Sequence, residues 1–253
     1  MQIVFPEFNH PTIQAALSEY NQTAATPVTG IPAEDLIAAC ELLKTGVADA
    51  MIAGIEYDSR SVILACRDYL GLSGHTFSGL AVMQRGAEVY LLADMAACKH
   101  PSIEQLTEIA RQTANSARQI LTTEPRLALL SFSTNGSGGH DESIDLLRSV
   151  RTTLQSEMLI DGEMQLDAAI NPAIGNKKFP NSPVAGQANV LIAPDLNTGN
   201  ILYKAFEQLA GFTVAGPILQ GFNYPVSDLS RGSSVADVVL TIETMAKLTA
   251  AKE

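Results

Sequence analysis

One pattern recurs along the chain: a short apolar run, then a turn rich in Gly, Pro or Ser, then a segment of helical period. The apolar runs at residues 50–53, 127–130 and 189–193 each predict a buried strand. Strands that alternate with helical segments are typical of parallel sheets, because each helix carries the chain back across the sheet. The pattern therefore predicts an α/β fold with mostly parallel sheets and helices on both faces.

Two of the helical segments carry clear start signals. Ser102 and Gln105 have capping-box spacing ahead of an apolar stripe. Pro32 stands where a first helical residue is expected, and Gly46 is placed to end that helix. Further helices are predicted at residues 12–20, 201–209 and 234–250.

The composition excludes several classes of protein. With 253 residues, 46% of them hydrophobic, the chain can bury the core of one large domain or two modest ones. A net charge of -11 leaves no basic stripe for nucleic acid. The three cysteines lack any CxxC pair, which disfavours disulfides and structural zinc. Neither a signal-peptide pattern nor an apolar run of membrane-spanning length is present, so we expect a cytoplasmic protein without membrane or nucleic-acid partners.

The segment DLSRGSSVAD at residues 228–237 places a polar loop directly before an apolar helical stripe. Free amide groups at a helix start and the positive end of its dipole favour an anion, which Arg231 could bind through two hydrogen bonds. Ser234 and Asp237 lie three residues apart, so Asp237 fits a capping box equally well. Spacing alone leaves both interpretations open.

Two further segments give weaker signals. The loop SFSTNGSGG at residues 131–139 follows a predicted strand, where parallel sheets bind ligands, but it matches neither a P-loop nor a dinucleotide fingerprint. In the acidic segment at residues 161–169, period two would place Glu163, Gln165 and Asp167 on one strand face. A magnesium site is conceivable there, although a polar strand end is the more common arrangement, and we expect no metal.

Together these segments resemble the phosphate acetyltransferase and phosphate butyryltransferase family, in order as well as in content. The resemblance implies two α/β domains of the isocitrate/isopropylmalate dehydrogenase type, with an active cleft between them, in a homodimer. The first domain would comprise residues 1–93 and 213–253, and the second residues 94–212. The matching segments are GVADAMIAG (46–54), FSGLAVM (77–83), LLADMAACKHPSIEQLTEIARQTANSAR (91–118), LALLSFSTNGSGG (127–139), DGEMQLDAAI (161–170), KFPNSPVAGQANVLIAPDLNTGNILYKAFEQLAG (178–211) and GPILQGFNYPVSDLSRGSSVADVV (216–239).

The family resemblance also implies a reaction and its residues. Coenzyme A, a substrate rather than a cofactor, would attack the carbonyl of an acyl phosphate directly, without a metal. Asp237 would accept the thiol proton, Arg231 would bind the phosphoryl group, and Ser230 would donate a hydrogen bond to the oxyanion. A carboxylate helps because a thiol with a pKa of about 8.5 is mostly protonated at neutral pH. The substrate-binding positions would be Ser78, Gly79, Ser133, Thr134, Gly136, Ser137 and Gly232.

Three features depart from the family pattern. Ser233 stands where family members often carry Cys, a loss that direct transfer without a cysteinyl intermediate would tolerate. Only a short connector separates Tyr20 from Pro32, where family members have additional strands and helices, so the first domain is expected to be trimmed. A GAxxTT-like segment is replaced at residues 54–61. These departures leave a second hypothesis, a non-catalytic paralogue that binds an anionic ligand or a protein partner in the same cleft, and a weaker third, an oxidoreductase.

Overall fold

The computed structural model describes residues 1–250 and divides the chain into two compact units. Unit 1 comprises Met1–Val82 and the chain from Thr213 onward, and unit 2 comprises Met83–Phe212. The chain passes from one to the other within strand β4 (Ser78–Arg85), earlier than the expected division after residue 93. The following strand, β5 (Glu88–Ala93), pairs with a strand of unit 2, which explains why the division falls ahead of it.

The described strands of unit 1 lie in the order β2-β1-β3-β10-β9, followed by residues 78–82 of β4. Strands β1, β2, β3 and β10 run parallel to one another, and β9 runs antiparallel to β10. The prediction of a mostly parallel sheet is confirmed for this unit. The strands are β1 (Gln2–Phe5), β2 (Thr29–Pro32), β3 (Ala50–Ala53), β9 (Thr213–Gln220) and β10 (Val226–Asp228).

The expected helix start at Pro32 is wrong, because Pro32 ends strand β2. Proline lacks a backbone N–H, and the outer position of β2 in the sheet tolerates that loss. Helix α2 (Leu36–Lys44) begins after Asp35, whose carboxylate accepts a hydrogen bond from the N–H of Ala38 at 2.8 Å. A side-chain cap therefore fixes the first helical residue at Leu36, four positions after the proline.

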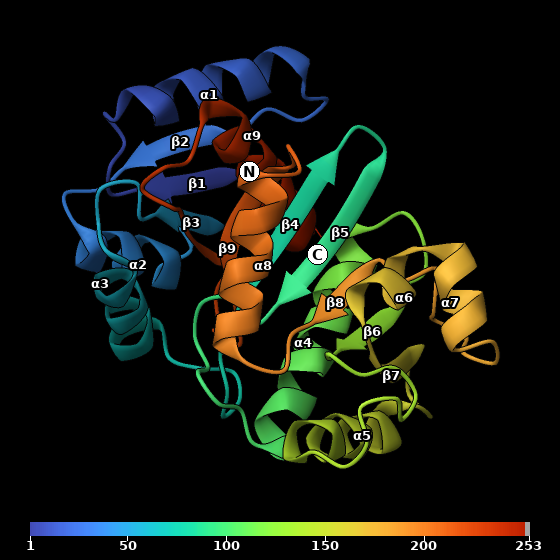
Figure 1. Ribbon diagram of the computed structural model, residues 1–253. Coiled ribbons are helices and arrows are strands. Elements are labelled where there is room, and N and C mark those ends of the chain that lie inside the picture. The colour runs from blue at the N-terminus through green and yellow to red at the C-terminus, as the bar shows by residue number, and fades with distance from the viewer. Residues whose placement is uncertain (251–253) are drawn as a thin grey trace. The chain divides into compact units, whose positions relative to one another are not determined.

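The helices of unit 1 form two groups. Helices α1 (Pro11–Thr23) and α9 (Val235–Ala250) contact each other, and α9 also packs on β9 and β10. Helices α2 and α3 (Ser59–Ala65) and the π-helical turn η1 (Cys66–Leu70) form the second group, which Figure 1 shows beside β3. Their core includes Val4, Cys40, Met51, Ala53, Val62, Cys66 and Val226.

Unit 2 has a sheet in which every named pairing is parallel, in the order β5-β8-β6-β7. Helix α4 contacts β5, β8 and helix α5, whereas α8 contacts β5 and α6 contacts β6. The strands are β6 (Leu127–Leu130), β7 (Ile160–Met164) and β8 (Val190–Ile192). The helices are α4 (Ile103–Ile120), α5 (Glu142–Leu154), α6 (Leu166–Ile170), α7 (Pro172–Lys178) and α8 (Leu196–Gln208).

The capping box predicted at the start of α4 is confirmed. The N–H of Gln105 donates to the Ser102 hydroxyl at 3.2 Å, and the Gln105 side chain accepts from the Ser102 N–H at 2.9 Å. None of the helices described is long and apolar enough to cross a membrane.

Candidate functional site

The Ser230–Arg231–Gly232 turn leaves the carboxyl end of β10 in unit 1. Its start is held to β3, because the N–H of Leu229 donates to the carbonyl of Ala53 at 2.6 Å. The N–H of Ser233 donates to the carbonyl of Ser230 at 2.9 Å and closes the turn just before α9. Arg231 is exposed and forms no hydrogen bond or ion pair with any residue between 1 and 250. Its guanidinium is therefore available to an anion at the start of α9.

Asp237 is buried in the first turn of α9 and completes a capping box, so the structural interpretation of its spacing is confirmed. Its Oδ2 accepts from the Ser234 N–H at 2.8 Å and from the Ser234 hydroxyl at 2.7 Å. Its Oδ1 accepts from the N–H of Val214 at 2.9 Å, which fixes the start of β9. A carboxylate offers about four lone-pair sites. Three of them are used here, and one on Oδ1 has no partner within residues 1–250.

Ser78 and Gly79 begin strand β4 and do not join this turn. The Ser78 hydroxyl accepts from the Gln220 side-chain amide at 3.0 Å, at the end of β9. Val226 pairs with Leu219 in the antiparallel β9–β10 ladder, so the Gln220 end of β9 lies by the start of β10. Ser78 and Ser230 therefore lie toward opposite ends of β10.

Asp228, the last residue of β10, is a buried carboxylate that sequence reasoning missed. Neither of its oxygens has a hydrogen-bond partner among residues 1–250. Burial raises the pKa of Asp228 to about 6, and the charges of Glu7 and Asp58 raise it as well, while the nearby hydroxyl of Ser59 offsets part of the rise. Its position two residues ahead of Ser230 was visible in the sequence, but its lack of partners was not.

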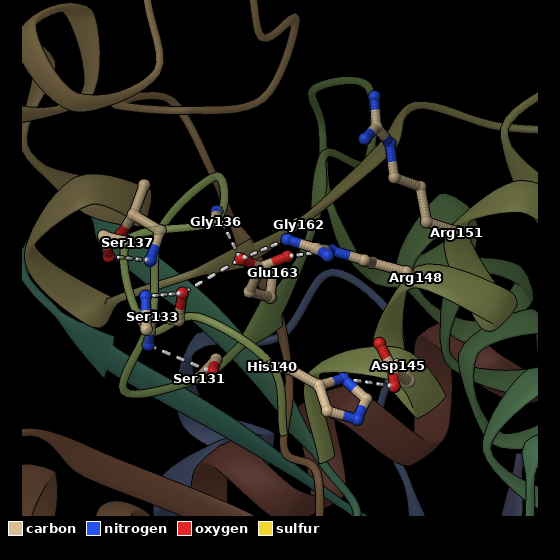
Figure 2. A network of polar contacts seen from close by, with 12 residues as sticks. Ser131, Ser133, Gly136, Ser137, His140, Asp145, Arg148, Arg151, Gly162 and Glu163 are labelled. Atoms are coloured by element: carbon tan, nitrogen blue, oxygen red, sulfur yellow. Dashed lines mark hydrogen bonds and ion pairs between the residues drawn. The ribbon is translucent and has the colours of Figure 1, made fainter. Parts of the chain in front are cut away.

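In unit 2, the loop after β6 folds around its own hydroxyl groups (Figure 2). The N–H of Gly138 donates to the Ser133 hydroxyl at 2.9 Å, and the N–H of Thr134 donates to the Ser137 hydroxyl at 2.9 Å. The Thr134 hydroxyl accepts from the N–H of Gln165 at 3.0 Å. These bonds bring Ser133, Thr134, Gly136 and Ser137 together at the carboxyl end of a parallel strand, as predicted for this loop.

Glu163 anchors that loop from β7. Its Oε1 accepts from the N–H of Gly136 at 2.7 Å and from the Ser133 hydroxyl at 3.0 Å. Arg148 of α5 donates to Oε2 through Nε at 2.9 Å and to Oε1 through Nη2 at 3.3 Å (Figure 2). Burial raises the pKa of Glu163, but the Arg148 pair and the hydrogen bonds outweigh it and hold the pKa below its ordinary value. The carboxylate therefore stays ionised and fixes the loop.

The expectation that Glu163, Gln165 and Asp167 share a strand face is wrong. Strand β7 ends at Met164, Gln165 is the N-cap position of α6, and Asp167 pairs with Lys178 at 2.8 Å. A helix start breaks the period of two on which the expectation depended. Among the described residues, no group of three or more His, Cys, Asp or Glu side chains could hold a metal ion.

An apolar pocket of about 540 Å³ lies in unit 2 beside the anchored loop. Leu130 and Phe132 line it from the end of β6, Leu166 from α6, and Thr198 and Ile201 from α8. Sequence reasoning missed it because its wall is assembled from elements far apart in the chain.

Comparison with known proteins places these features in a family. The family model described as "Phosphate acetyl/butaryl transferase" matches residues 22–246. The chain belongs to this family. A phosphate acetyltransferase of Thermoanaerobacterium thermosaccharolyticum is 41% identical over 218 residues, which cover 82% of this chain and 66% of that protein. A phosphate acetyltransferase of Treponema pallidum is 43% identical, with 79% of this chain and 64% of that protein covered.

The family also contains solved structures with this fold. The crystal structure of a phosphotransacetylase from Streptococcus pyogenes superimposes with a TM-score of 0.84 at 30% identity, over 99% of this chain and 94% of that one. The chain spans about two thirds of the length of the two curated relatives named above. The α/β fold with mostly parallel strands is therefore that of the phosphotransacetylases, whereas the likeness to isocitrate and isopropylmalate dehydrogenases and the interdomain cleft remain predictions.

Proposed function

We propose that this chain transfers a short acyl group, such as acetyl, propionyl or butyryl, between coenzyme A and phosphate. The observation that carries the proposal is the Ser230–Arg231–Gly232 turn of a family member, with a guanidinium at the start of α9 that has no partner among the described residues. An exposed arginine at the positive end of a helix dipole is suited to the phosphoryl group of an acyl phosphate. The substrates are then acyl-coenzyme A and phosphate in one direction, and acyl phosphate and coenzyme A in the other.

The proposed step is a direct acyl transfer. The sulfur of coenzyme A attacks the carbonyl carbon of the acyl phosphate, a carbon–sulfur bond forms, and the bond from that carbon to the phosphate oxygen breaks. Arg231 binds the phosphate that leaves, and Ser230 donates a hydrogen bond to the oxyanion of the tetrahedral intermediate. Asp237 accepts the thiol proton on the remaining lone-pair site of Oδ1. Its bonds to Ser234 and Val214 would then keep the base in a fixed position.

The unit 2 loop has a supporting role in this proposal. Ser133, Thr134, Gly136 and Ser137 line part of the substrate site, and the Glu163–Arg148 pair keeps that lining rigid. Ser78 and Gly79 take no part in this proposal, because Ser78 lies toward the other end of β10 from Ser230. We propose a homodimer as the working assembly.

The proposal is tested by the release of free thiol from acetyl-, propionyl- and butyryl-coenzyme A in the presence of phosphate. Arg231→Ala should lower kcat/KM about 100-fold or more with an unchanged unfolding temperature, because the side chain is exposed. Unchanged activity would remove its assigned role. Calorimetric binding of phosphate or coenzyme A without turnover on any of the three donors would instead identify a non-catalytic paralogue.

A matched pair of variants separates the two functions of Asp237. Ser234→Ala removes the cap but keeps the carboxylate, so it should cost about 1 kcal/mol of stability and little activity. Asp237→Asn removes the base and should lower kcat at least about 100-fold. Equal effects of both variants on kcat would show that the carboxylate is only structural.

A further inference from the structure

Glu7 follows β1 in unit 1 and is almost fully buried. Its carboxylate accepts hydrogen bonds from four successive backbone N–H groups at the carboxyl end of β3. Oε2 accepts from Gly54 at 2.8 Å and Ile55 at 3.4 Å, and Oε1 accepts from Glu56 at 2.6 Å and Tyr57 at 2.8 Å. Successive N–H groups that converge in this way form an anion-binding nest. Here the nest is filled by a side chain of the protein itself.

The loop held by Glu7 packs directly against the start of the Ser230–Arg231 turn. Gly54 has a φ of +103°, and a Cβ at this position would lie 2.4 Å from Oδ1 of Asp228 and 2.7 Å from the carbonyl oxygen of Leu229. Ala53 is paired with Asp228 in the parallel ladder, so both loops leave the same edge of the sheet. With no side chain between them, a shift of residues 54–57 is passed on to Leu229 and then to Ser230.

We propose that Glu7 is a positioning residue for the acyl transfer: by filling the nest at residues 54–57, its carboxylate fixes the turn that presents Ser230 and Arg231. The inference rests on the proposed function of that turn. Glu7 touches no reacting atom in this account and acts through Gly54 and Leu229. A purely stabilising role would lower the unfolding temperature without changing the rate per folded molecule, and that difference can be measured.

The experiment compares Glu7→Ala, Glu7→Gln and the control Glu56→Ala, whose exposed side chain lies next to the nest without filling it. Thiol release is measured well below each unfolding temperature, with kcat and KM separated and with formate added as a small replacement carboxylate. Glu7→Ala should lose at least about tenfold in kcat/KM, since small misplacements of an active site have effects of that size. Formate should restore most of this loss without affecting the wild type or Glu56→Ala. Glu7→Gln places an amide N–H group where the nest needs an acceptor, so its kcat/KM should be lowered and formate should not restore it.

The inference would be overturned if both Glu7 variants had the kcat/KM of the wild type. It would also be overturned if added formate raised the unfolding temperature of Glu7→Ala without raising its rate of thiol release. Hydrogen exchange at the Gly54 and Leu229 amides gives a second readout that does not need activity. The link between the two loops is supported if both amides exchange faster in Glu7→Gln than in the wild type. If Glu7→Ala folds, formate should also slow the exchange of both amides in that variant. Unchanged exchange at Leu229 refutes it. If the wild type releases no thiol, the proposed reaction fails and the exchange readout alone decides the role of Glu7.

Discussion

Replacing Asp228 with Asn should make the protein more stable at neutral pH. The buried carboxylate has no hydrogen-bond partner in the described chain, and its pKa is raised to about 6 from an ordinary value of 3.8. The folded state therefore keeps a proton between pH 4 and 6 that the unfolded chain releases, so the stability contribution of Asp228 falls as pH rises through this window and stays low above it. The side chain of Asn is of similar size and does not ionise.

The size of the effect follows from the gap between the two pKa values. At about 1.4 kcal/mol for each pKa unit, the gap corresponds to about 3 kcal/mol. We expect Asp228→Asn to exceed the wild type in free energy of unfolding by about 2.4 kcal/mol more at pH 7.5 than at pH 4, where the folded Asp228 is protonated and the unfolded one is already about half ionised.

The assay is denaturant unfolding of both proteins across this pH range, since the shared titration of all other groups cancels in the difference. Glu34→Gln, which removes an exposed carboxylate from the same unit, is the control. A difference between Asp228→Asn and wild type that is the same at pH 4 and at pH 7.5 would refute the reasoning, because it would show that the buried carboxylate titrates as it does in the unfolded chain.

Two further substitutions test the packing around the candidate site. Gly54→Ala should destabilise the fold by at least about 3 kcal/mol in thermal unfolding, because the added methyl group meets Asp228 and Leu229 at a residue with positive φ. The control Gly86→Ala should cost only about 1 kcal/mol, because its methyl group meets nothing within 4 Å. Equal costs for the two variants would contradict the close approach at Gly54. Arg148→Ala should lower the free energy of unfolding by about 1–3 kcal/mol in a denaturant titration, because it leaves the buried Glu163 without its cation. The control Arg67→Ala removes an exposed ion pair and should cost less than about 0.5 kcal/mol. A loss below about 1 kcal/mol for Arg148→Ala would show that Glu163 does not depend on the pair.

The parts of the fold that depend on local sequence could be predicted. Residues 50–53 and 127–130 form strands because each is an apolar run bounded by turns, and the Ser102–Gln105 cap depends only on spacing within one helical turn. Strand β2 was missed because residues 29–32 contain Gly and Pro and lie at the edge of the sheet, where pairing with β1 outweighs a weak local preference.

The contacts that hold the candidate site could not be predicted, because they join distant parts of the chain. Glu7 bonds a loop 47 to 50 positions further along the chain, and no local pattern marks it. Arg148 and Glu163 meet only because α5 packs on β7. The motif at residues 228–237 showed Arg231 and Asp237 as candidates, but the bond from Val214 to Asp237 depends on how β9 meets α9.

The central claim is acyl transfer between coenzyme A and phosphate at the Ser230–Arg231 turn. It is tested most directly by mixing the protein with acetyl-coenzyme A, with and without phosphate, and following both products, free coenzyme A by its thiol and acetyl phosphate by phosphorus NMR. The account predicts equal amounts of the two products with phosphate, neither without it, and loss of both in Arg231→Ala. Free coenzyme A in the absence of phosphate, or equal turnover by Arg231→Ala, would contradict it.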